Sequence, residues 1–123
     1  MKHLRQGFTL IELVVVITIL GILSVVAIPK YMNLSTDAYQ ATTKGIAGAL
    51  ESSSAANYVM RSANSARGTV ISNCLNMASL LQNSLPTGYT LNNSAIASGS
   101  SAVCIVTAPS ATITVAFQGV GVS

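Results

Sequence analysis

The chain opens with an apolar run that is long enough for a membrane-spanning helix. Residues 8–28 are apolar apart from five positions, which are Thr9, Glu12, Thr18, Gly21 and Ser24. A helix needs about 20 such residues to cross the hydrocarbon core of a bilayer. Lys2, His3 and Arg5 precede the run. Because basic residues that flank a span stay on the cytoplasmic side, the sequence predicts an N-terminal helical anchor with the rest of the chain outside.

A glycine and a proline interrupt the helical pattern. Gly21 lies within the apolar run and Pro29 directly follows it. Proline inside a helix removes a hydrogen bond and costs about 3 kcal/mol, so we expect a kink or local flexibility between these two residues. Beyond Pro29, residues recur at roughly helical spacing in a stripe formed by Tyr31, Leu34, Ala38, Ala41, Ala49 and Ala56. The sequence therefore predicts one kinked helix, with a hydrophobic half at 8–29 and an amphipathic half at 30–62.

The remaining residues, 63–123, change to short segments separated by turn-forming residues. A short helix is predicted at 72–83, a turn at Pro86-Thr87-Gly88, and an exposed connection at 92–101. Three alternating or β-branched segments predict strands, at 87–91, 102–107 and 111–118. The predicted fold class is α+β, in which the long helix packs against a small antiparallel β-sheet.

Charge is scarce and does not form a nucleic-acid footprint. Charged residues make up 7% of the chain, and the formal net charge is +3. Without residues 1–7, four basic and three acidic side chains remain, which leaves +1. The four basic residues are spread out, at Lys30, Lys44, Arg61 and Arg67. A phosphate-binding surface needs a denser cluster.

The two cysteines, Cys74 and Cys104, are candidates for a single disulfide. Their even number in an exported chain favours pairing, and closing a loop of that length stabilises a fold by roughly 3–4 kcal/mol in the chain-entropy model. The alternative is a pair of buried thiols.

No catalytic or metal-binding constellation stands out. The single histidine, His3, precedes the apolar run, so the rest of the chain offers no Ser-His-Asp or Cys-His arrangement. Asp37 and Glu51 lie on one predicted helix about 21 Å apart in rise, too far for a pair of catalytic carboxylates. Too few acidic residues are present for a typical calcium site. The sequence predicts no enzyme, no cofactor and no metal.

Glu12 is the most informative residue of the apolar run. A charge deep in a membrane helix costs roughly 2.5–3.5 kcal/mol on insertion scales, so such residues usually mark a function. The basic head, Gly7-Phe8, Glu12 near the start of an apolar helix, Gly21 and Pro29 together resemble the N-terminus of the type IV pilins and of the related type II secretion pseudopilins. The resemblance is close from Lys2 to about Lys30, and beyond that it rests on the layout of a long helix, a small sheet and two cysteines.

The resemblance implies a processing site at Gly7-Phe8. In the family, a membrane peptidase cuts after the glycine and methylates the new amino group, so residues 1–7 would be a leader and Phe8 would be the mature N-terminus. The alternative is an ordinary secretory leader cut after Ala27, against which stands the acidic Glu12 in its apolar core.

Glu12 has two interpretations. The simpler one is a carboxylate that reaches the membrane interface. The resemblance implies instead a partner for the Phe8 amino group of a neighbouring subunit. Two unit charges about 4 Å apart attract by roughly 4 kcal/mol at an effective dielectric near 20, which would give assembly both register and driving force.

The resemblance implies a structural subunit of a type IV pilus, acting in adhesion and twitching motility. Its partners would be other pilin subunits in a homopolymer, a prepilin peptidase and methyltransferase, a pilus assembly platform and an outer-membrane secretin. It would be held in the bacterial inner membrane, with its C-terminal domain periplasmic, and become extracellular in the pilus. DNA uptake also occurs in the family, but the scattered basic residues do not support DNA as a partner.

Two other interpretations stay open. The first is a pseudopilin of a type II secretion system, against which the lack of an acidic cluster argues. The second is an exported binding domain with an ordinary signal peptide, for which Glu12 would be dispensable.

Overall fold

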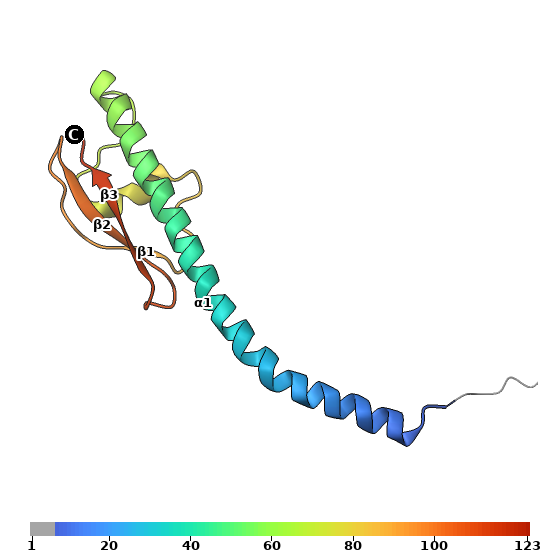
Figure 1. The fold of residues 1–123 in the computed structure, drawn as a ribbon. Helices are drawn as coiled ribbons and strands as arrows, with labels where there is room; N and C mark the ends of the chain where they lie inside the picture. The colour runs from blue at the N-terminus through green and yellow to red at the C-terminus, as the bar shows by residue number, and fades with distance from the viewer. Residues whose placement is uncertain (1–6) are drawn as a thin grey trace, which may run out of the picture. The chain divides into compact units, whose positions relative to one another are not determined.

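The computed structural model describes residues 7–123, so Lys2, His3 and Arg5 lie outside the described residues. Its elements follow in the order α1 (Leu10–Ala63), the 3-10 helix η1 (Cys74–Leu80), β1 (Thr90–Leu91), β2 (Ser101–Thr107) and β3 (Thr114–Val120) (Figure 1). The chain divides into an N-terminal unit that ends at Asp37 and a globular unit, Ala38–Ser123. The predicted α+β class is confirmed.

The N-terminal unit consists of the first part of helix α1. The helix begins at Leu10 and continues without interruption through Gly21 and Pro29. Every side chain from Gly7 to Tyr31 is exposed. By length and composition α1 is able to cross a membrane, with a mean hydropathy of 2.8 in its most apolar window. The flexibility assigned to Gly21 and Pro29 stays a prediction about assembly.

The sheet of the globular unit is antiparallel, in the order β1-β2-β3. Strands β2 and β3 pair along their full length, with Cys104 opposite Phe117. The predicted third strand began too early, at 111, because the hairpin turn occupies those positions. The amide of Ala111 donates to the Ala108 carbonyl at 2.9 Å, and the Ala108 amide donates to Ile113 O at 2.9 Å. The predicted strand at 87–91 is reduced to the two residues of β1.

The segment 92–101 is largely exposed, as predicted, but part of it is anchored in the core. Ile96 is buried, and its amide donates to the Ser72 carbonyl at 2.8 Å. The Cys74 amide in turn donates to Ser94 O at 2.9 Å. These backbone hydrogen bonds hold the segment against the start of η1, which pattern alone did not indicate.

Helix α1 buries a different face from the one predicted. Figure 1 shows its later part lying across the strands. The predicted stripe is wrong, because Tyr31, Leu34, Ala38, Ala41, Ala49 and Ala56 are all exposed. The buried side chains of this part are Thr43, Ala47, Leu50, Ser54 and Asn57. They follow the helical period, but three of the five are polar, so a search for apolar residues does not find them.

The buried polar residues hold the helix to the backbone of the globular unit. Ser54 Oγ accepts a hydrogen bond from the Val120 amide at 2.7 Å. Asn57 donates to the Thr69 carbonyl and accepts from the Thr69 amide, both at 2.8 Å. Buried polar groups are tolerated when they are hydrogen-bonded in this way, so the stripe combines packing with fixed attachment points.

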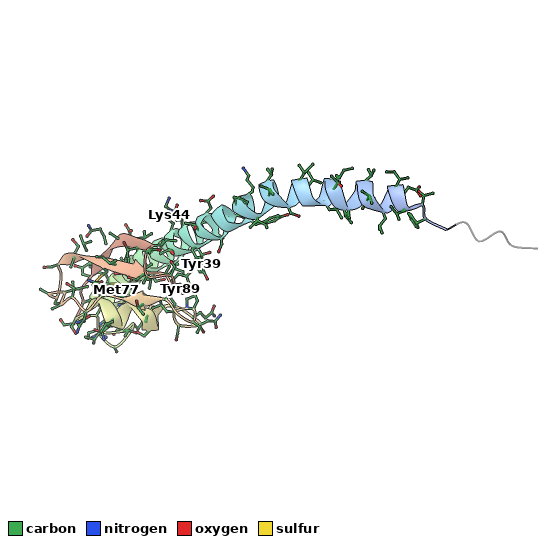
Figure 2. The ribbon with its side chains drawn as sticks, turned by 90° about the horizontal axis from the view of Figure 1, so that it is seen from below. Tyr39, Lys44, Met77 and Tyr89 are labelled. Carbon is green, nitrogen blue, oxygen red and sulfur yellow. A yellow bond between two sulfur atoms is a disulfide. The ribbon has the colours of Figure 1, made fainter. Side chains whose placement is uncertain are left out.

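The predicted disulfide is confirmed and lies at the centre of the core. Cys74 and Cys104 are fully buried, with their Cα atoms 5.7 Å apart, and they join η1 to β2. Met77, labelled in Figure 2, packs beside them. A Cβ atom added at Gly119 would lie 2.8 Å from Met77 Sδ and 3.0 Å from Cys104 Sγ. Glycine at this position of β3 is therefore what lets the sheet approach η1 closely.

Replacing Ser54 by alanine is expected to lower the free energy of unfolding of the globular unit by about 1–3 kcal/mol, because the buried Val120 amide loses its acceptor. Ser52→Ala, on the exposed face of the same helix, is the matched control and should change stability by less than about 0.5 kcal/mol. Urea unfolding of the detergent-solubilised full chain measures both. Equal stabilities would contradict the attachment role of Ser54.

Candidate functional site

The candidate site is the segment from Gly7 to Glu12, where the chain enters helix α1. Gly7 and Phe8 lie outside regular secondary structure, because α1 begins at Leu10, two residues later than its predicted start at 8. Phe8 is 90% exposed, and no atom lies within 4 Å of the space that a side chain at Gly7 would occupy. The bond between them is therefore accessible to an enzyme, since exposed non-helical backbone is the usual site of cleavage.

Thr9 and Glu12 form a capping box at the start of α1. The Thr9 amide donates to Glu12 Oε2 at 3.0 Å, and the Thr9 hydroxyl donates to the same oxygen at 2.9 Å. The Glu12 amide donates to Thr9 Oγ1 at 3.3 Å. This reciprocal pattern satisfies two amides that a helix otherwise leaves without partners. Glu12 therefore has a structural role within its own chain.

The sequence analysis missed this capping box, although the signal was present. A threonine followed three residues later by a glutamate, at the head of an apolar run, is the sequence signature of the motif. The predictions for Glu12 concerned only its charge in an apolar environment and not its hydrogen bonds with Thr9. Both hydrogen bonds from Thr9 are accepted by the same oxygen of the carboxylate, Oε2.

The other polar residues of the apolar run are satisfied by the helix itself. The Thr18 hydroxyl donates to the Val14 carbonyl, and the Ser24 hydroxyl donates to the Leu20 carbonyl, each at 2.7 Å. An unpaired hydroxyl is costly in an apolar medium. With these hydrogen bonds, the Glu12 carboxylate is the one charged group on the exposed surface from Leu10 to Ile28.

The other predicted site residues lie elsewhere. Gly21 and Pro29 are within α1, and Cys74 and Cys104 form the core disulfide of the globular unit. Among residues 7–123, no group of three or more His, Cys, Asp or Glu side chains is positioned to hold a metal ion.

Comparisons with known proteins identify the same N-terminal segment. Residues 2–28 match the family profile described as "Prokaryotic N-terminal methylation motif". The chain is 61% identical over 33 residues to a type IV major fimbrial protein FimA of Dichelobacter nodosus, a match that covers 27% of this chain and 21% of the relative. The resemblance to the type IV pilin family is confirmed.

Two further relatives match over longer stretches of this chain. The type IV narrow pilus major component PilA5 of Thermus thermophilus is 47% identical over 47 residues, which cover 38% of this chain and 40% of the relative. Fimbrial protein EcpC of Eikenella corrodens is 40% identical over 48 residues, 39% of this chain and 31% of the relative. The chain thus spans less than half the length of these relatives. No solved structure matches it.

Thr9→Ala is expected to weaken the first turn of α1 by about 1 kcal/mol, the usual contribution of an N-cap side chain. The measurement is amide hydrogen exchange of residues 10–13 in detergent, where exchange should become faster. Thr18→Ala is the control, since its hydroxyl bonds only to the preceding turn. First-turn exchange that is unaffected by Thr9→Ala would contradict the capping box.

Proposed function

We propose that this chain is a structural subunit of a type IV pilus. A peptidase removes residues 1–7 and methylates Phe8, the apolar part of α1 holds the subunit in the inner membrane, and the subunit then polymerises with copies of itself. The observation that carries the proposal is the exposed apolar surface from Leu10 to Ile28, whose polar groups are satisfied within the helix. A surface of this kind requires a membrane or a protein partner.

The relatives support a pilus rather than a secretion pseudopilus. Their names describe major components of type IV fimbriae and of a type IV narrow pilus. The role proposed for this chain is accordingly structural rather than catalytic. Its further partners are the assembly platform and an outer-membrane secretin, and its adhesive and motility functions follow from the polymer.

Glu12 would contribute to assembly through its charge. In the proposed polymer, the amino group of Phe8 pairs with the Glu12 carboxylate of a neighbouring subunit, while Oε2 continues to accept from Thr9. Pairing removes the cost of an isolated charge in an apolar environment. The subunit therefore gains more by entering the filament than by remaining in lipid.

DNA is not supported as a partner of the part of the globular unit that follows Arg67. From Gly68 to Ser123 the chain contains no Lys, Arg or His, and no Asp or Glu. Affinity for nucleic acid depends largely on cationic contacts with phosphates. Any ligand of this surface would be recognised through hydrogen bonds and apolar contacts.

The intact mass of the protein in a sheared cell-surface fraction tests the processing. The expected species begins at Phe8, carries one added methyl group, and is two hydrogens lighter than the dithiol because of the Cys74–Cys104 bond. A species that begins at Ile28 would instead identify a secretory leader and contradict the proposal.

Two substitutions of Glu12 separate its charge from its capping role. Glutamine at the third helical position also completes a capping box, so Glu12→Gln keeps the cap and removes the charge, whereas Glu12→Ala removes both. We expect both variants to be inserted and processed, and both to give at least about tenfold fewer surface fibres, the factor that a loss of 1.4 kcal/mol produces. Normal fibre yield from Glu12→Gln would mean that the cap alone matters.

A further inference from the structure

The exposed flank of α1 carries charges that alternate at a fixed step. Lys30 and Asp37 lie seven positions apart in the N-terminal unit, and Lys44 and Glu51 lie seven positions apart in the globular unit. All four side chains are exposed. In each pair the lysine precedes the acidic residue. Asp37 and Lys44 are also separated by seven positions in the sequence.

These charges have no partner along their own helix. Ion pairs within a helix form between residues three or four positions apart. At those distances from each of the four residues, the sequence has no charged side chain. Seven residues correspond to about 10.5 Å of helical rise, which is too far for direct contact within a pair.

The flank is separate from the face that packs on the sheet, and it has room for a neighbour. Lys44 lines a hollow of about 310 Å³ together with Gln40 and residues 112–115, at the start of β3. Figure 2 shows Lys44 on the helix beside the strands. In the N-terminal unit, Lys30 and Asp37 line a hollow of about 480 Å³ with Tyr31 and Leu34.

We infer that α1 helices of neighbouring copies pack in parallel and are displaced by seven residues. Lys44 of one copy then meets Glu51 of the next, and Lys30 meets Asp37. The inference rests on the proposed function, because it describes how copies of the chain contact one another in the polymer. Each unit gives the same displacement independently, so the argument does not depend on how the two units are arranged.

Charge complementarity selects this displacement over others. Copies in register would bring each charge next to its own kind, and a displacement of fourteen residues would again bring Lys30 next to Lys44. Exposed ion pairs contribute little affinity individually, but complementary charges across an interface fix register by penalising the wrong alignments. Hydrophobic burial would supply the affinity, and the charges would select the axial position.

The displacement has the same direction as the contact proposed for Glu12. In that contact, the Phe8 amino group of one copy meets an acid four positions further along its neighbour. In the charge pairs, a lysine of one copy meets an acid seven positions further along. The axial difference of three residues, about 4.5 Å, is within the span of a lysine and an acidic side chain. One neighbour therefore serves both contacts.

Thiol crosslinking in assembled fibres tests the displacement. In the full chain, Lys44→Cys is combined with Glu51→Cys, and sheared fibres are treated with a short bismaleimide. The native cysteines are held in the buried disulfide and do not compete. The expected result is a ladder of covalent multimers in denaturing electrophoresis, whereas either single variant stays monomeric.

The matched control combines Lys44→Cys with Tyr58→Cys. Tyr58 is exposed and lies fourteen positions after Lys44 on α1, so it tests the displacement that brings like charges together. A ladder from the control pair and none from the 44/51 pair would overturn the inference. If the 44/51 variant forms no fibres, Lys30→Cys with Asp37→Cys provides the same test and the same two outcomes.

Charge inversion distinguishes electrostatic register from simple proximity. Lys44→Glu is expected to lower fibre yield, and inverting all four charges in one chain should restore it, because every pair between copies is again opposite in sign. If the variant with all four charges inverted forms no more fibres than Lys44→Glu, the charges do not determine the axial displacement between copies. Absence of fibres from the unaltered chain would instead overturn the proposed function and the displacement together.

Discussion

The globular unit depends on the contact between helix α1 and the inner face of the sheet. Its sheet has three strands, one of only two residues, and so small a sheet is not stable unless another element covers it. Leu50 supplies fully buried apolar surface. Further along the helix, Ser54 binds the backbone of Val120 and Asn57 binds the backbone of Thr69. Helix and sheet therefore fold as one cooperative core, which includes the buried disulfide.

The composition of the globular unit makes this core unusual in its electrostatics. Since residues 68–123 carry no charged side chain, no ion pair within that segment contributes to its stability. Backbone hydrogen bonds, such as the reciprocal pair between Ile71 and Val122 at 2.9 Å, connect its segments instead. The charged side chains of the described residues therefore all lie on α1, except Arg67, which follows it closely. In the proposed polymer, these side chains contribute to contacts between copies.

In the proposed function, the first part of α1 occupies two apolar environments in succession. Its hydroxyl groups and its one carboxylate make hydrogen bonds within the helix, so transfer from lipid to a bundle of helices breaks none of them. The remaining change is the pairing of a charge. In the proposed polymer, a capping residue of one chain thus also serves as the ionic partner of the next.

The sequence by itself determined the features that arise from local pattern and composition. These features are the long helix, predicted at 8–62 and found at 10–63, the two longer strands within a few residues, and the pairing of two cysteines. The family resemblance at Gly7-Phe8 and Glu12 also follows from the sequence. The signature of the capping box, Thr9 followed three residues later by Glu12, was also present in the sequence. It was not predicted, because Glu12 was interpreted only through its charge.

Only the tertiary structure decided which face of α1 is buried and which loop residues belong to the core. Apolarity and helical period favoured the alanine stripe, yet Ser54 and Asn57 are buried in its place, because a polar side chain is stable inside when a backbone partner from a distant segment meets it. Ile96 is an apolar side chain that packs in the core, and its backbone amide is satisfied there by the Ser72 carbonyl, from a segment more than twenty residues earlier. Such partners lie far away in sequence and become neighbours only when the chain has folded.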